Sequence, residues 1–154
     1  MLWVIQGVFS FIATAAFGIL FNAPKKTLFH CGLAGAIGWL IYFTLQKQGV
    51  DAVPASFAGA FVISIVAHIL ARRFKMPMII FSVAGIIPLV PGGMAYNAMR
   101  HVVENDYLAS IQYAARAFII TGAIVMGLVF AEVFMQLIFN MIRKRKAKAI
   151  GDVM

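Results

Sequence analysis

The sequence has few charged residues. They make up 12% of its 154 residues, and only five residues are acidic. Hydrophobic residues make up 63%, whereas a soluble domain carries about 25% charged residues and about half apolar ones. A chain with this composition is not a soluble globular domain. It is an integral membrane protein.

Cysteine is also scarce, because Cys31 is the only one. A single cysteine excludes a disulfide within the chain and a metal site built from cysteines. The sequence also lacks an H-E-x-x-H motif, paired aspartates and a serine nucleophile with a nearby base. We therefore expect no metal, no cofactor and no enzymatic activity.

Long apolar runs are abundant. Five of them have the roughly 17 to 25 residues that a helix needs to cross a membrane. They cover Leu2 to Phe21, Thr27 to Gln46, Val53 to Ala71, Met76 to about Met99, and Ala117 to Asn140. The sequence thus predicts an all-α polytopic membrane protein, with a single domain over residues 1–142 and a basic cytoplasmic tail over 143–154.

The first run is expected to stay in the protein as a span. Ala13-Thr14-Ala15 resembles a signal-peptide cleavage site, but no Lys or Arg precedes the run, which is also long for a signal sequence.

The basic residues are distributed unevenly between the two ends of the expected spans. Lys and Arg cluster after the first, third and fifth runs, and only Lys47, Arg100 and Arg116 lie at the opposite ends. Cytoplasmic loops carry the excess of basic residues, so the N-terminus is expected outside and the C-terminus in the cytoplasm. Topology therefore explains the net charge of +8. We expect the tail to contact anionic lipid, and we expect no nucleic-acid partner.

The fourth run contains a break at Pro91-Gly92-Gly93, with Pro88 shortly before it. Lys75 and Pro91 are about 24 Å apart along a helix, which places the break in the outer half of the membrane. Proline removes a backbone donor, and glycines permit conformations that other residues avoid. Bare backbone cannot face lipid, so we expect the break to be buried in protein or to line a wet cavity.

A second half-helix is expected from Met94 to about Val103. Its first amides would point back at the break, where the positive end of the helix dipole favours an anion. Tyr96 and Arg100 share one face of it, and Asn97 lies on the next. These residues and the break are predicted to bind substrate, as broken helices do in many transporters. A proline kink that only shapes packing remains the alternative.

Small residues recur at four-residue intervals in two runs. The second run has Gly32, Gly35 and Gly38, with the small pairs Cys31/Gly35 and Ala34/Gly38 four residues apart, and the fifth has Gly127 four residues from both Ala123 and Ala131. Such faces let helices approach closely in lipid. They serve either packing within the chain or docking of a second subunit.

Glu132 is the only acidic residue within an expected span. A carboxylate there is costly, so we expect it to face the bundle interior and to exchange a proton. A structural role, or pairing with a residue of a partner, remains the alternative. Gln136 and Asn140 continue the same face at one-turn spacing.

The motifs at the first turn and at the break resemble those of the threonine/serine exporter family. The matching segments are Phe21-Asn22-Ala23-Pro24-Lys25-Lys26, the glycine-rich second run, and Arg73-Phe74-Lys75-Met76-Pro77 leading into IIPLVPGGMAY. The resemblance covers nearly the whole chain. Within the family, the chain resembles the small subunit of the split, two-component form. Its motif positions here are Pro88, Pro91, Gly92, Gly93 and Tyr96, with Asn22 and Pro24 at the first turn. Glu132 matches no family pattern.

The resemblance implies a multi-pass inner-membrane exporter of small amino acids or related carboxylates, working with a larger homologous subunit. If both halves have five spans and are joined directly in fused relatives, they must have opposite orientations, with the substrate site between them. The main expectation is therefore a subunit of a secondary-active exporter, in which the half-helix amides and Asn97 bind the substrate carboxylate. The alternative is a non-transporting accessory subunit, for which changes at Gly92 and Gly93 would alter assembly rather than flux.

Overall fold

The computed structural model describes the backbone of residues 2–151 and the side chains of residues 2–142, and its regular elements in that range are all helical. In chain order they are α1 (Leu2–Leu20), α2 (Lys25–Lys47), α3 (Ala52–Phe74), α4 (Ile79–Ile86), the 3-10 turn η1 (Ile87–Leu89), α5 (Gly92–Val103) and α6 (Tyr107–Gly151). The side chains of the predicted basic tail, 143–154, lie outside the described residues.

The predicted all-α polytopic fold is confirmed. Four helices are long and apolar enough to cross a membrane: α1, α2, α3 and the Tyr107–Ile142 part of α6. The segments Ile79–Leu89 and Gly92–Val103 supply a fifth span if this bent pair counts as one. The first three helices begin and end within a few residues of the predicted runs.

Local signals in the sequence mark where these first three helices begin or end. Asn22, just after α1, adopts a left-handed conformation with φ 57°, and Pro24 is the N-cap of α2. The Asp51 carboxylate caps α3 by accepting a hydrogen bond from the Val53 amide at 3.3 Å. Lys75 closes α3 in the left-handed region, which satisfies the last carbonyls of the helix.

Close helix crossings form the core of α1 to α4. A Cβ atom on Gly32 would lie 2.6 Å from the Phe11 ring of α1, and one on Gly35 would collide with Thr14 of α1. Gly38 likewise lies against Ile63 of α3. These glycines of α2 therefore face helices of the same chain.

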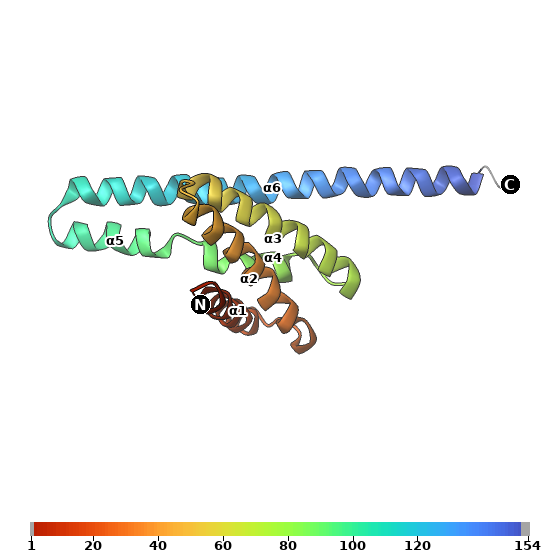
Figure 1. Ribbon diagram of the computed structural model, residues 1–154, viewed down its shortest axis with the longest axis horizontal. Coiled ribbons are helices and arrows are strands. Elements are labelled where there is room, and N and C mark those ends of the chain that lie inside the picture. The colour runs from red at the N-terminus through yellow and green to blue at the C-terminus, as the bar shows by residue number, and fades with distance from the viewer. Residues whose placement is uncertain (1, 152–154) are drawn as a thin grey trace.

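Helix α6 lies along α3 (Figure 1). A polar or charged side-chain contact joins the two segments near each end of the crossing. Arg116 of α6 donates to Asp51, just before α3, at 2.6 Å. At the other end the Arg72 guanidinium of α3 lies over the Phe139 ring of α6. The two contacts are about 34 Å apart along α6, close to the thickness of a bilayer's hydrocarbon core. We call the two ends of the α3–α6 crossing the Asp51 end and the Arg72 end.

The fifth run was predicted to start at Ala117, and the helix that contains it starts earlier. Helix α6 begins at Tyr107, and its first part forms a hairpin with α5 that projects past the α2–α3 turn at the Asp51 end (Figure 1). Inside the hairpin, the buried Ser110 hydroxyl donates to the Ala98 carbonyl at 2.8 Å. A helix need not end where lipid ends, because its polar first turns can continue into water.

Candidate functional site

The break in the fourth span lies between η1 and α5, where the chain turns by 52°. Val90 is extended, with φ −61° and ψ 128°, because the ring of Pro91 disfavours a helical conformation in the residue before it. The Gly92 amide then bonds back to the Val90 carbonyl at 2.7 Å. Pro88, half-buried within η1, removes another backbone donor just before the turn.

The two glycines after Pro91 do not adopt the special conformations predicted for them. They begin α5, and Gly49 is the only glycine with positive φ among the described residues. A Cβ atom added to either Gly92 or Gly93 would meet nothing within 4 Å. Neither backbone conformation nor crowding inside the chain therefore requires glycine here.

The break was expected to be buried in protein or to line a wet cavity, and residues 2–142 do not bury it. Val90 is 52% exposed, and both Gly92 and Gly93 are exposed. The reason is that α5 leaves the α1–α4 bundle and pairs with α6 alone, so only one side of its first turn is covered. The other side has no cover from residues 2–142.

The first turn of α5 has amides free to bind a ligand. The Ala95 amide bonds to the Pro91 carbonyl at 3.1 Å, and Pro91 offers no capping side chain. Within residues 2–142, the amides of Gly93 and Met94 have no acceptor. Such a helix start favours an anion such as a carboxylate.

A cavity of about 260 Å³ lies beside this turn, between α5 and α6. Its lining residues are Val90, Pro91, Gly92, Ala95, Ala117, Phe118 and Thr121. The lining is apolar except for Thr121, whose hydroxyl donates to the Ala117 carbonyl at 2.9 Å. Phe118 is 81% exposed, so the cavity opens on the surface of the chain. Phe118 and Thr121 were not predicted to belong to the site, because nothing in the run marks them as neighbours of the break.

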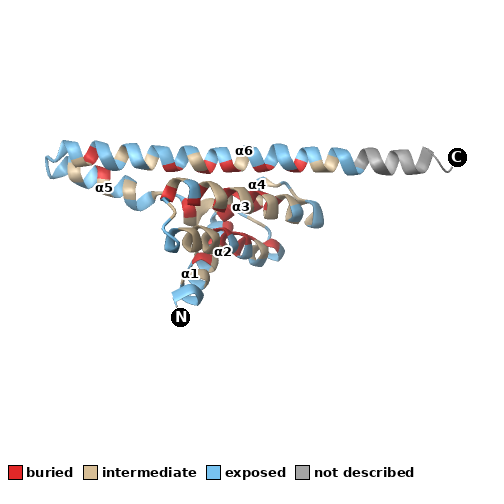
Figure 2. Cartoon of the chain, turned by 45° about the horizontal axis from the view of Figure 1, so that its top comes forward, coloured by how far each residue is buried: buried red, intermediate tan, exposed pale blue. Residues whose placement is uncertain are grey.

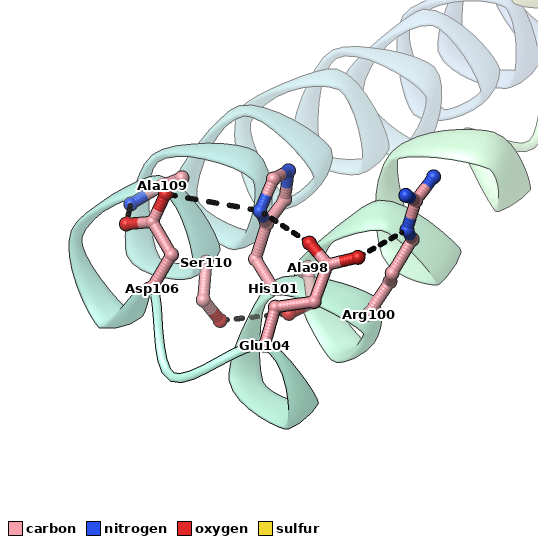
Figure 3. Close-up of polar contacts among 7 residues, drawn as sticks. All are labelled: Ala98, Arg100, His101, Glu104, Asp106, Ala109 and Ser110. Carbon is pink, nitrogen blue, oxygen red and sulfur yellow. Dashed lines mark hydrogen bonds and ion pairs between the residues drawn. The ribbon is translucent and has the colours of Figure 1, made fainter.

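The other residues predicted to bind substrate lie along α5, away from the cavity lining. Tyr96 is 68% exposed, and Asn97 is half-buried. The Arg100 guanidinium donates to Glu104 at 2.8 Å, about 12 Å along the helix from Gly92 (Figure 3). The structure therefore brings Pro91 and Gly92 together at the cavity and leaves Tyr96, Asn97 and Arg100 on later turns.

A polar cluster occupies the far end of the hairpin. His101 stacks on Tyr113 of α6 with ring centroids 5.3 Å apart. Its Nδ1 lies 3.5 Å from a Glu104 carboxylate oxygen (Figure 3). A groove of about 390 Å³ beside it is lined by His101, Ala109, Gln112, Tyr113 and Arg116. The acidic and basic side chains of this polar cluster are exposed or half-exposed, so solvent weakens the attraction between them.

Glu132 does not face the bundle interior, which corrects the prediction. It is exposed, and its carboxylate accepts one hydrogen bond, at 3.4 Å from Gln136 on the same helix. The neighbouring Ala131 is fully buried, and successive residues are about 100° apart around a helix. In lipid, an ionised side chain at this depth costs roughly 3 kcal/mol on an insertion scale.

Gly127 lies on the opposite face of α6 from the exposed side chains. A Cβ atom there would be 2.6 Å from the Phe57 carbonyl oxygen of α3. This glycine therefore permits the α3–α6 crossing within the chain.

Comparison with known proteins agrees with this architecture. Residues 6–134 match the family described as "Threonine/Serine exporter, ThrE". An uncharacterized protein of Haemophilus influenzae is 31% identical over 146 residues, covering 82% of this chain. The match covers 49% of that protein, so the chain spans about half the length of this relative. No solved structure matches. The chain belongs to the threonine/serine exporter family.

Proposed function

We propose that the chain is one subunit of a secondary-active exporter of threonine, serine or related small carboxylates in the inner membrane. Its partner would be a larger homologous membrane subunit, and export would be coupled to protons. The observation that carries this proposal is the start of α5. Two free amides, of Gly93 and Met94, lie beside a cavity that one small molecule can enter.

The residues around the break have different roles in binding the substrate. Pro88 and Pro91 fix the turn, and the amides after Gly92 hold the substrate carboxylate. Once a partner covers the open side of the cavity, its apolar lining would exclude water, which strengthens that interaction. Tyr96, Asn97 and Arg100 occupy the following turns of α5, where Arg100 attracts an anion that leaves towards the hairpin.

Glu132 supplies the proton coupling. Its carboxylate has no basic partner within residues 2–142, so the groups that a partner subunit places beside it would set when it holds a proton. In an antiport cycle, protonation at one side and release at the other would drive the substrate outward.

The experiment is an export assay in cells loaded with radiolabelled threonine, serine or a dicarboxylate. We expect faster efflux of one substrate class when this chain and the larger subunit are produced together than when either is produced alone. Equal efflux of every substrate, with and without the pair, would refute the transport function.

A non-transporting accessory subunit is the second candidate, favoured by the open space around Gly92 and Gly93. The double variant Gly92→Ala/Gly93→Ala separates the two functions, because neither added methyl clashes within the chain. A transport role predicts lower flux with the subunits still assembled. An accessory role predicts that the complex itself is lost, which co-purification of the two tagged subunits would reveal.

A further inference from the structure

Helix α6 has two faces with different surroundings (Figure 2). One face lies against the chain's own bundle, and it includes the buried residues Ile120, Ile124, Ala131 and Met135. The opposite face has no cover from the described residues. It consists of Phe118, Gly122, Val125, Val129, Glu132, Gln136 and Asn140, all exposed and spaced three or four residues apart. We call this set the free face of α6.

The free face has the length and the contour of a helix-docking surface. It extends about 33 Å along α6, close to the thickness of the hydrocarbon core. A Cβ atom on Gly122 would meet nothing within 4 Å, so a second helix backbone can approach there. Apolar residues occupy the half near the Asp51 end, and polar ones occupy the half near the Arg72 end.

The polar half identifies the chemistry of what covers it. Glu132 accepts one long hydrogen bond from Gln136, and the free face contains no basic residue. Lipid tails cannot satisfy a carboxylate. A basic side chain on the complementary surface, at the level of Glu132, would satisfy this carboxylate.

A second copy of this chain does not provide that charge. Two copies related by a twofold axis along the membrane normal would bring the same surfaces together, so Glu132 would meet Glu132. Like charges at close range oppose such a pairing. The Haemophilus influenzae relative has about as much chain again outside the match, which is enough for a different half with its own helices.

The free face is also continuous with the cavity at the break. Phe118 belongs to both, and Thr121, next to Gly122, lines the cavity. A helix laid along the free face would therefore close the open side of that cavity. The seam between the two helices would then run from the cavity to Glu132, about 16 Å along α6 from Thr121.

We propose that the free face of α6 is the docking surface for a transmembrane helix of the larger exporter subunit, and that this helix places a basic side chain opposite Glu132. The inference rests on the proposed function, because it takes the partner from it. It adds which surface of the chain forms the seam and which chemistry the partner helix must supply.

Site-specific photo-crosslinking tests the face. A photoreactive phenylalanine is placed at Phe118, at Val129 or at Phe130, in cells that also produce the tagged larger subunit. Phe130 is the matched control, since it is an exposed phenylalanine on the same helix that lies against Phe57 of α3. We expect crosslinks to the larger subunit from Phe118 and Val129 and at least threefold fewer from Phe130.

Co-purification tests the proposed pairing of Glu132 with a basic side chain of the partner helix. Glu132→Leu should reduce the recovered larger subunit by roughly threefold or more, the range of a single interhelical polar contact. The control Phe130→Leu should leave recovery unchanged. Equal recovery with Glu132→Leu would overturn the pairing at Glu132.

Two other crosslinking outcomes would overturn part of the proposal. Crosslinks from Phe118 and Val129 to a second copy of this chain would overturn the assigned partner, and equal crosslinks from all three positions would overturn the face. Export assays in the same cells separate this inference from the transport function. Export without the expected crosslinks refutes the docking face alone, and crosslinks without any export refute transport while leaving the docking face intact.

Discussion

Two glycines of α6 differ in what surrounds them, and this difference predicts opposite effects of the same substitution. A methyl group on Gly127 would lie 2.6 Å from the Phe57 carbonyl oxygen, whereas one on Gly122 would meet nothing within 4 Å. Gly127→Ala should destabilise the chain by about 1–3 kcal/mol, because α3 and α6 must move apart. Gly122→Ala should leave stability unchanged or raise it slightly, since alanine favours helix. Thermal unfolding of the purified chain in detergent measures both, and equal melting temperatures would contradict the close α3–α6 crossing.

A substitution at Glu132 tests whether this residue couples export to protons. Glu132→Gln keeps a polar side chain of the same shape but cannot exchange a proton, so export should lose most of its dependence on the pH gradient. The measurement is substrate flux in vesicles that contain both subunits, with and without an imposed gradient. Asp51→Asn is the matched control, because that carboxylate lies at the helix end beside Arg116 and should not affect coupling. An unchanged response to the gradient in Glu132→Gln would remove the coupling role.

At the scale of whole elements, one buried side-chain hydrogen bond among residues 2–142 joins the two helices of the α5–α6 hairpin, from Ser110 to the Ala98 carbonyl. Ser110→Ala should loosen α5 by about 1 kcal/mol, the usual net value of such a bond. Hydrogen exchange of the amides from Gly92 to Val103 should then become faster. Thr121→Val serves as the control, because its hydroxyl bonds only within α6. Equal exchange in Ser110→Ala and the parent chain would show that the bond does not hold the hairpin.

Element boundaries also show what could be predicted from the sequence. The first three helices were predictable, because Asn22, Pro24, Asp51 and Lys75 end or begin helices through local chemistry. The true start of α6 had a local signal too. Asp106 precedes that helix and accepts a hydrogen bond from the Ala109 amide at 3.1 Å, as an N-cap does. The prediction relied on hydropathy instead, which reports where lipid begins and not where a helix begins.

The placement of Glu132 needed an argument from helix geometry. The small residues Gly127 and Ala131 predicted a packing face of α6, and the structure has both buried there. A residue directly after Ala131 lies about 100° away from that face. The same helix therefore could not turn Glu132 into its own bundle, although the sequence did suggest an inward carboxylate. The free amides at the break were anticipated, but the pairing of α5 with α6 depends on long-range contacts that no local pattern reports.

For the whole molecule, the distribution of basic residues predicts a definite orientation. The α2–α3 turn should face the outside, and the end of α3 should face the cytoplasm. Cysteine variants of Gln48 and Lys75 test this with a membrane-impermeant maleimide on intact cells. The native Cys31 is buried and should stay silent. Labelling at Gln48 but not at Lys75 is expected, and the reverse pattern would invert the topology and place the break on the cytoplasmic side.

The isolated chain leaves the break uncovered on one side and Glu132 exposed on α6, so it has no enclosed route across a membrane within the residues described. We therefore expect the purified chain in liposomes to move threonine, serine or dicarboxylates no faster than protein-free liposomes. Adding the larger subunit should produce flux that responds to a pH gradient. The control is a pair containing Gly92→Ala/Gly93→Ala, which should assemble and transport slowly. Rapid, gradient-dependent transport by the chain alone would mean that its own copies cover these surfaces, and that the partner subunit is not required.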